Sequence, residues 1–144
     1  MKLTLTAVEN IPMVEPGDDL VEQICAGLDS MNESLLDDDI LVLAQKIVSK
    51  AENRYVDLKS VVPSVEAIAL GLEVDKDPRK VQVILDESNE VVRKRPGVLI
   101  VEHRLGFVAA NAGIDQSNIQ KSGVDGDDLC LLLPVDADAA AEKH

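Results

Sequence analysis

The chain contains almost no aromatic side chains: Tyr55 and Phe107 are the only two among its 144 residues, and Trp is absent. Aromatic residues usually provide the largest buried areas in a protein core, so the core of this chain must be built from aliphatic side chains. Apolar residues make up 46 % of the sequence and charged residues 28 %, which is typical of a globular protein and not of a disordered one. We therefore expect a single domain spanning residues 1–144.

The charge of the chain excludes several classes of function. Its 27 acidic and 14 basic side chains give a formal net charge of −13. A chain with this charge and few aromatics is poorly suited to bind single-stranded nucleic acid or a phosphate backbone. The apolar runs are too short for a membrane span, and residues 3–8 are too short for the core of a signal peptide. We expect a cytoplasmic protein that contacts neither nucleic acid nor a membrane, with Cys25 and Cys130 as buried, reduced thiols.

Short apolar stretches predict the strands. Residues 2–8 alternate between apolar and polar side chains, as in a half-buried strand, and residues 40–44 are wholly apolar, as in a central strand. Further strands are expected at 55–58, at 98–101 with 105–109 as hairpin partner, and at 129–133, where Pro134 ends the strand.

Capping residues predict the helices. Asp18 or Asp19 can cap one helix, Ser64 a second, and Asp77 a third that has Pro78 at its first position; Asp136 begins a capped tail. The expected apolar faces are Leu20, Val21, Ile24, Cys25 and Leu28 in the first helix, Val65, Ile68, Ala69 and Leu72 in the second, and Val81, Ile84 and Leu85 in the third. Helices and strands interleave, so the fold class is α+β (mixed α/β), with a mixed sheet and flanking helices. Parallel and antiparallel strand pairs are both compatible with this order.

Charged side chains are unevenly distributed. Residues 15–39 contain nine acids and no Lys or Arg, which favours a solvated face, and the three aspartates at 37–39 favour a turn over a metal site. Seven of the fourteen basic residues lie between positions 76 and 104. This cluster can attract an anionic ligand, but residues 93–95 equally suit the solvated face of an edge strand, and we favour that interpretation.

Lys50 is a candidate phosphate-binding residue. It follows the predicted strand at 40–44, and ligands of α/β sheets usually bind at the carboxyl ends of strands. A lysine ammonium there can act as a point charge for phosphate oxygens, with the polar side chains of Gln45 and Ser49 beside it. A surface lysine at the end of a strand is an equally good interpretation. The chain has no Walker-type phosphate loop.

A second candidate segment is the run of small residues at 110–118. Gly113 permits a positive φ, and the small neighbouring side chains let the backbone approach a ligand closely. Asp115 offers a hard carboxylate ligand for Mg²⁺ or Mn²⁺, and Asn118 offers a hydrogen-bond donor and an acceptor. The same spacing is compatible with an Asx turn that holds no ligand.

Five stretches together resemble the coenzyme F420-0:L-glutamate ligase family, specifically the amino-terminal part of its chains. They occur in the family's order and span almost the whole sequence: IPMV at 11–14, PGDD at 16–19, KIVSK at 46–50, EHRLGFV at 102–108 and ANAGIDQSN at 110–118. The family joins L-glutamate to the deazaflavin coenzyme F420-0 through a γ-glutamyl amide bond, using GTP and Mg²⁺ or Mn²⁺, with K⁺ as a further ion. The resemblance implies an acyl-phosphate intermediate and a homodimer.

The resemblance also implies residue roles. Ile11, Pro12, Met13, Val14, Gln45, Lys50 and Asn118 would contact GTP, and Asp115 would bind the metal. Gln45 stands where some members of the family have Ser, and no catalytic base is implied. The arrangement fits phosphoryl transfer, which depends mainly on positioning and on neutralisation of charge.

Family chains continue well past the position of Pro134 and supply further metal ligands there, in an Asp-Thr pair. The resemblance therefore predicts either a portion of a longer ligase or a short relative that lacks those ligands. A non-catalytic nucleotide-binding or dimerisation module on the same scaffold is the alternative function. A third possibility is a ligase that joins a different carboxylate and amine at the same nucleotide site.

Overall fold

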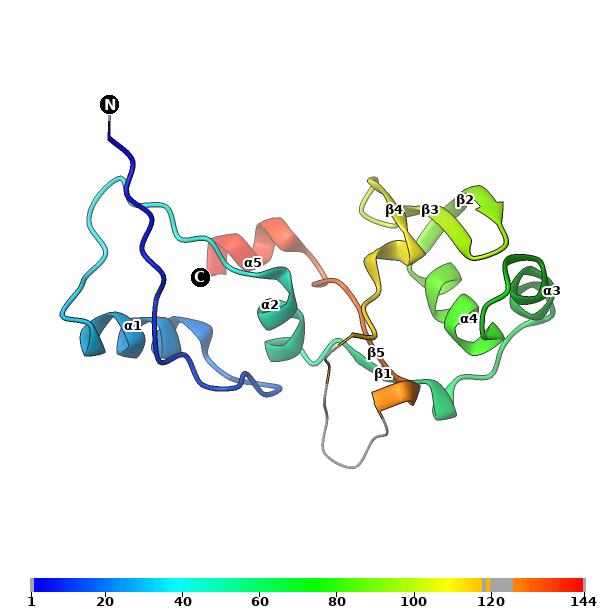
Figure 1. Ribbon diagram of the computed structural model, residues 1–144, viewed down its shortest axis with the longest axis horizontal. Coiled ribbons are helices and arrows are strands. Elements are labelled where there is room, and N and C mark those ends of the chain that lie inside the picture. The colour runs from blue at the N-terminus through cyan, green and yellow to red at the C-terminus, as the bar shows by residue number, and fades with distance from the viewer. Residues whose placement is uncertain (1, 118, 120–125, 144) are drawn as a thin grey trace. The chain divides into compact units, whose positions relative to one another are not determined.

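The computed structural model describes residues 2–117, 119 and 126–143 (Figure 1). The chain divides into two compact units: unit 1 comprises Met1–Arg54 and Pro134–His144, and unit 2 comprises Tyr55–Leu133. Helices and small antiparallel sheets make up the fold, which confirms the α+β class. Among the described residues, no helix combines the length and the apolar character needed to cross a bilayer. The expectation of one domain stays a prediction.

Unit 1 is built from helices α1 (Leu20–Ser30), α2 (Gln45–Ala51) and α5 (Ala137–Lys143). Asp19 caps α1 as predicted, because its carboxylate accepts hydrogen bonds from the backbone N–H groups of Val21 and Glu22. The core of the unit consists of buried aliphatic side chains: Val14, Leu20, Ile24, Leu28 and Val48. Gly27 lets the preceding chain cross α1 closely, since a Cβ there would lie 2.7 Å from Val8 Cγ1.

The two strands predicted in unit 1 are wrong. Residues 2–8 and 40–44 are irregular, and within the described chain no other segment pairs with their backbone. The alternating and apolar patterns identify residues suited to a sheet, but a strand also needs a partner for its N–H and C=O groups. Gln45 and Lys50, expected just beyond a strand, instead lie in helix α2.

Unit 2 holds the strands and the remaining helices. These are β1 (Tyr55–Asp57), α3 (Val65–Val74), α4 (Pro78–Asp86), β2 (Ser88–Arg95), β3 (Val98–His103), β4 (Val108–Ala110) and β5 (Leu129–Leu131), with short 3₁₀ turns at Leu58–Ser60, Asn111–Gly113 and Gly126–Asp128. One antiparallel sheet has the order β2-β3-β4, and β1 pairs with β5 in a second. The predicted strands at 55–58, 98–101, 105–109 and 129–133 thus each overlap a strand of the structure, and β3 and β4 form the expected hairpin.

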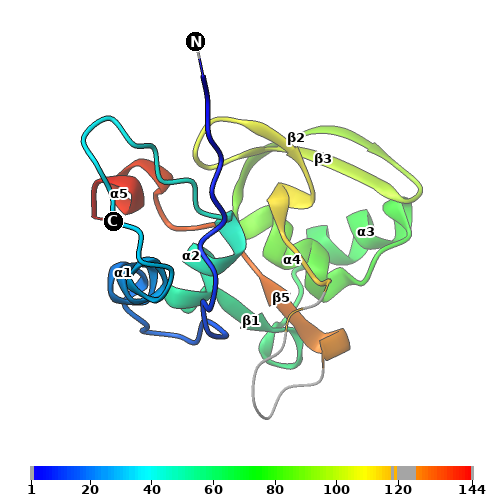
Figure 2. The ribbon, with the colours of Figure 1, turned by 60° about the vertical axis from the view of Figure 1, so that its left-hand side comes forward.

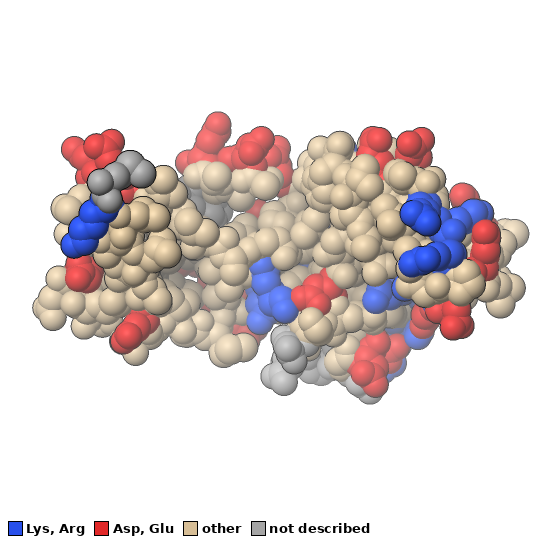
Figure 3. All heavy atoms as spheres, turned by 45° about the horizontal axis from the view of Figure 1, so that its top comes forward, with Lys and Arg blue, Asp and Glu red and all other residues tan. Residues whose placement is uncertain are grey.

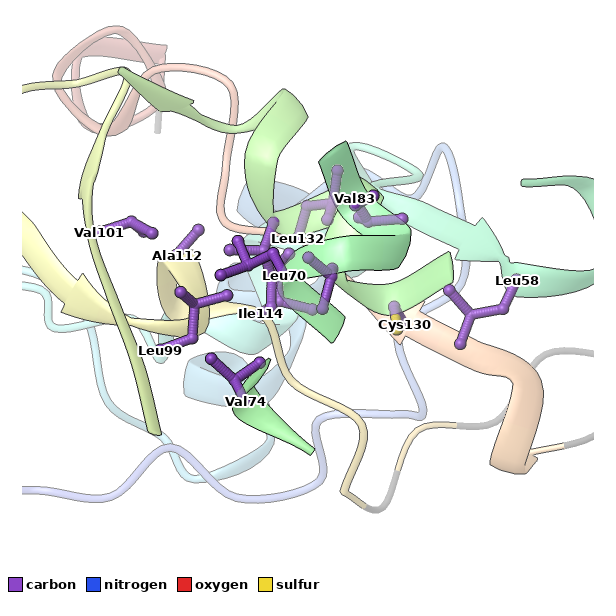
Figure 4. Packing of buried hydrophobic residues seen from close by; sticks show 13 residues of the cluster. Leu58, Leu70, Val74, Val83, Leu99, Val101, Ala112, Ile114, Cys130 and Leu132 are labelled. Carbon is purple, nitrogen blue, oxygen red and sulfur yellow. The ribbon is translucent and has the colours of Figure 1, made fainter. Parts of the chain in front are cut away.

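The core of unit 2 lies between the β2–β3 hairpin and the helices α3 and α4, which pack side by side (Figure 2). Along β3, Leu99, Val101 and His103 point inward in alternation. Figure 4 shows Leu99 and Val101 facing Leu70 and Ala112 across this core. As the composition predicts, the core is aliphatic.

Ser64 caps α3 and Asp77 caps α4, both as predicted, yet the predicted face of α3 is wrong. Ala67, Leu70, Gly71 and Val74 are buried, whereas Val65, Ile68 and Leu72 are exposed. This helix is apolar around most of its circumference, so periodicity alone does not determine which side faces the core.

The cysteine prediction is half right. Cys130 is buried, but Cys25 is exposed, and Val21 on the same predicted face of α1 is exposed as well. The buried stripe of α1 runs through Leu20, Ile24 and Leu28, at a spacing of four residues. Val21 and Cys25, one position further along, therefore lie at the edge of that stripe.

Candidate functional site

Residues 11–14, expected to contact GTP, run along the core of unit 1. Val14 is buried and Ile11 packs against the same cluster, whereas the side chains of Pro12 and Met13 are exposed. Two aliphatic anchors therefore fix a short stretch of backbone whose other side chains meet solvent. The exposed side chains of Pro12 and Met13 and the backbone beside them are therefore the groups of this segment that a ligand could contact.

Helix α2 lies next to this segment and carries Gln45, Ser49 and Lys50. Val48 of α2 belongs to the same cluster as Val14, and the Gly17 N–H donates a 2.9 Å hydrogen bond to the Ala51 carbonyl. The Gln45 Nε2 donates to Ser49 Oγ at 2.9 Å, one turn further along the helix. The structure thus brings the two predicted nucleotide-contacting segments of unit 1 together.

Lys50 is unusually buried for a lysine. Only 7 % of the residue is exposed, and it forms no ion pair with the part of unit 1 that the structure describes. A lysine in this state buries its methylene stem and leaves its ammonium group as the part that meets solvent or a ligand. Since this ammonium has no ion-pair partner among the described residues, an anionic oxygen of a ligand could serve as its counter-ion. The local geometry therefore suits the phosphate-binding role.

Asp115 follows a turn with an uncommon backbone. Asn111, Ala112 and Gly113 all have positive φ, at 51°, 54° and 69°. At Gly113 a Cβ would also lie 2.7 Å from Leu133 Cδ1, so glycine is required for space as well as for φ. After the turn, Asp115 pairs with Leu131, with N–H···O distances of 3.0 and 2.8 Å. The turn and this bridge together fix the backbone position of Asp115 beside β5.

The carboxylate of Asp115 forms an Asx turn. Its Oδ1 accepts hydrogen bonds from the Ser117 N–H and the Ser117 hydroxyl, both at 2.7 Å. The ligand-free interpretation of this segment therefore matches the geometry, but it does not exclude metal binding, because metal-ligating carboxylates are commonly hydrogen-bonded themselves. Asn118 lies outside the described residues.

Among the described residues, no group of three or more His, Cys, Asp or Glu side chains is placed to hold a metal ion. Mg²⁺ usually takes one or two carboxylates together with substrate phosphates and water. Asp115 therefore fits a metal as one ligand of several and does not form a site alone.

Lys80 is a cation near Asp115 that the sequence pattern does not single out. Its ammonium donates to Gln116 Oε1, and Gln116 Nε2 donates to the Asp127 carbonyl at 3.2 Å. Lys80 lies in the first turn of α4, and the sequence predicts this helix from its cap. The sequence does not predict that Lys80 lies beside Gln116, because that contact depends on tertiary packing.

Three of the seven basic residues between positions 76 and 104 pair with carboxylates in the described structure. Lys94 contacts Glu73 at 2.7 Å, Arg104 contacts Glu87 at 3.1 Å, and Arg79 bridges to Asp128 at 3.1 Å. Figure 3 shows basic side chains gathered on the right of the view, with acidic side chains at the edges of the group. Because β2 is an edge strand of its sheet and residues 93–95 are exposed, the structure agrees with the solvated-edge interpretation of these three residues. The predicted turn at 37–39 is also present, with the Leu36 N–H donating to Asp39 Oδ2.

The stretch at 102–108 has a structural role in unit 2. The ring of His103 is buried and stacks on Phe107, with 4.7 Å between the ring centroids. Its Nδ1 accepts a hydrogen bond from the Leu105 N–H at 3.1 Å. These contacts hold the turn between β3 and β4, and β4 leads directly into the turn before Asp115.

Comparison with protein families matches residues 9–143 to a model described as F420-0:Gamma-glutamyl ligase. The chain belongs to this family. The match covers every described residue to which the sequence assigns a ligand role, and it confirms the resemblance drawn from the five sequence stretches.

Three named relatives illustrate the relationship to F420 ligases. The chain is 43 % identical over 143 residues to the coenzyme F420:L-glutamate ligase of Methanothermobacter thermautotrophicus, covering 99 % of this chain and 54 % of the relative. The ligases of Haloarcula marismortui and Methanosarcina barkeri are 45 % and 37 % identical, over 94 % and 99 % of this chain and 51 % of each relative. The chain thus spans about half the length of the curated relatives it matches.

The predicted site residues of this F420 ligase family member fall into two groups. Ile11, Val14, Gln45 and Lys50 lie together in unit 1, and Asp115 lies in unit 2. That Lys50 and Asp115 face the same polyphosphate stays a prediction.

Proposed function

We propose that the chain contributes the nucleotide-binding part of a GTP-dependent ligase that adds L-glutamate to coenzyme F420-0 through a γ-glutamyl amide bond. Membership of the F420-0:gamma-glutamyl ligase family across residues 9–143 carries this proposal. The burial of Lys50, whose ammonium has no ion-pair partner among the described residues, supports it, since that group suits a phosphate oxygen.

The proposed chemistry has two steps. A substrate carboxylate oxygen attacks the γ-phosphorus of GTP, which forms an acyl phosphate and releases GDP. The amine of glutamate then attacks the acyl carbon, and inorganic phosphate leaves with the bonding electron pair as the amide forms. A divalent metal, when bound, neutralises phosphate charge. In this chain Lys50 would hold phosphate oxygens, residues 11–14 would orient the nucleotide, and Asp115 would supply one metal ligand.

The activity test uses GTP, Mn²⁺, glutamate and F420-0, and measures a mass gain of one glutamate on the coenzyme. The chain is assayed as it is and also joined to the half of the Methanothermobacter ligase that lies outside the matched region. We expect product from the joined form. A joined form that is folded, binds nucleotide and makes no product would contradict the ligase assignment.

Nucleotide binding is tested separately by thermal unfolding of the chain with GDP and Mn²⁺, because a ligand of the folded state raises the melting temperature. Lys50→Met keeps the buried stem and removes the charge, so it should abolish the shift. Lys46→Met, in the same helix, is the matched control and should preserve it. Asp115→Asn keeps an acceptor for Ser117 and should remove only the part of the shift that depends on Mn²⁺.

A non-catalytic module is the second candidate function, and the incomplete set of metal ligands among the described residues favours it over a ligase for a different carboxylate and amine. A chain that binds GDP but stays inactive when joined to the second half would be such a module. We also propose a homodimer in the cytoplasm, by analogy with the family. Light scattering of the purified chain tests the dimer.

A further inference from the structure

Two extended segments of unit 1 leave large aliphatic side chains in water. In residues 2–8, Leu3 is 82 % exposed and Leu5 89 %; in residues 40–44, Ile40 is 88 % exposed and Val42 85 %. We call these two stretches the open segments. In Figure 1 both run as extended chain, dark blue at the start of the molecule and cyan before α2.

Each open segment is attached to the core of unit 1 at one end. Val8 packs against the core and lies over Gly27, and Leu43 packs against the same cluster. Ile40 and Val42 occupy the positions that alternate with Leu43, as on the second face of a strand. The segments therefore have the side-chain pattern of strands with apolar residues on both faces. Unit 1 covers one face of each segment, and only at Val8 and Leu43.

The backbone of the open segments has no strand partner among the described residues. Within the described chain, no backbone hydrogen bond joins residues 2–8 or 40–43 to another segment. Extended chain with free N–H and C=O groups and apolar side chains is the template to which a further strand adds. An exposed apolar surface of this kind marks a docking site more often than a solvated surface.

The relatives are longer than this chain, and their additional length is a source of polypeptide that could cover the open segments. They match this chain along nearly all of its length, yet the match accounts for only 54 % and 51 % of two of them. We propose that the open segments pair as strands with the polypeptide that corresponds to the unmatched half of the family's ligases, in one sheet that neither half completes alone. The inference needs the family relationship and not the proposed reaction.

The test co-produces the chain with the unmatched half of the Methanothermobacter ligase, each carrying its own tag, and measures the mass of the purified species. We expect a one-to-one complex. In that complex, hydrogen exchange at residues 2–8 and 40–44 should become slow, because strand pairing protects backbone N–H groups. Protection distinguishes an added strand from a merely apolar contact.

Substitutions in the open segments test whether these segments form the contact with the second half. Leu5→Lys and Val42→Lys should each weaken the complex by about tenfold or more, since charge would be buried among apolar side chains. Both side chains are in water in the chain alone, so its helix content and melting temperature should not change. Val62→Lys is the matched control: Val62 is 87 % exposed in unit 2, and its replacement should leave the complex intact.

The same variants are also made in the form that joins the two halves in one polypeptide, so that an insoluble second half does not prevent the test. There Leu5→Lys and Val42→Lys should lower the melting temperature and Val62→Lys should not. The proposal is overturned by no association in either form, by association without protection of the open segments, or by equal sensitivity to all three variants. A dimer of the chain alone that Val42→Lys disrupts would identify a second copy as the occupant and also overturn it. Ligase activity is not read out, so a failed reaction leaves this test unaffected.

Discussion

Gly113 shows how much one residue contributes to the turn before Asp115. Its φ is +69°, and a Cβ would lie 2.7 Å from the side chain of Leu133. Gly113→Ala should lower the free energy of unfolding by about 2–3 kcal/mol, from backbone strain and overpacking together. Gly97→Ala is the control, because Gly97 has a φ of +78° with no atom within 4 Å, and it should cost about 1 kcal/mol. Urea unfolding of both variants measures the difference; equal losses would show that Leu133 moves aside freely.

The two cysteines differ in reactivity for a physical reason. Burial raises the pKa of the Cys130 thiol to about 11, whereas Cys25 is exposed. Since the thiolate is the nucleophile, iodoacetamide at pH 7 should modify Cys25 in the folded chain and Cys130 only after unfolding. Mass spectrometry of the modified peptides measures this. Fast modification of Cys130 under native conditions would mean that its part of unit 2 opens readily.

At the residue scale, the sequence shows which side chains have the chemistry of a ligand-binding residue. It is less informative about the burial and the hydrogen bonds of those side chains. Asp115 stands out in the sequence because a carboxylate beside small residues suits a metal, and the structure shows the Asx turn that is the competing interpretation. Lys50 is expected beyond a strand, but it lies in a helix and is buried. Burial depends on which segments meet in space, and one sequence carries that information only indirectly.

Helix caps are local, and for that reason they are predictable. Asp77 accepts hydrogen bonds from the Arg79 backbone N–H at 2.8 Å and from the Arg79 guanidinium. The guanidinium's hydrogen bond holds the pKa of the Asp77 carboxyl below its ordinary value, although partial burial opposes the shift. All of these partners lie within two residues, so the pattern Asp-Pro-Arg contains the information.

This cap gives a prediction with a definite dependence on pH. Asp77→Ala should lower the free energy of unfolding by about 1 kcal/mol at pH 7, through loss of the cap. A carboxyl with a depressed folded-state pKa stabilises the fold fully above its unfolded pKa of about 4, and that stabilisation disappears as the pH falls through the folded-state value. The difference from the parent should therefore shrink in urea unfolding at pH 3. Asp77→Asn keeps a side-chain oxygen that can accept from the Arg79 backbone N–H, so it should lower the free energy of unfolding by less than Asp77→Ala at pH 7. If the loss caused by Asp77→Ala does not depend on pH, the charge of Asp77 does not contribute to stability.

Elements that depend on distant partners are predicted less well. The patterns of residues 2–8 and 40–44 correctly mark extended apolar chain, but no strand forms because no partner strand lies within the described residues. The apolar face of α3 is misassigned because the helix has apolar side chains on both sides. By contrast, β3 and β4 are consecutive in the chain, so neighbouring sequence is enough to predict their hairpin.

At the scale of the whole molecule, the two units differ in the size of their cores. The main cluster of unit 2 contains thirteen described buried residues and that of unit 1 contains five. Local stability follows buried apolar contact, so native-state hydrogen exchange should be slowest in α4 and β3 and faster in α1 and α2. Val101→Ala removes methyl groups from the core of unit 2 and should accelerate exchange in α4 and β3, whereas Leu20→Ala should act mainly on α1 and α2.

If each variant instead accelerated both sets of amides equally, the 144 residues would unfold as one cooperative domain, as their length and composition predict. The separate response expected here would mean that each unit opens as its own cooperative unit.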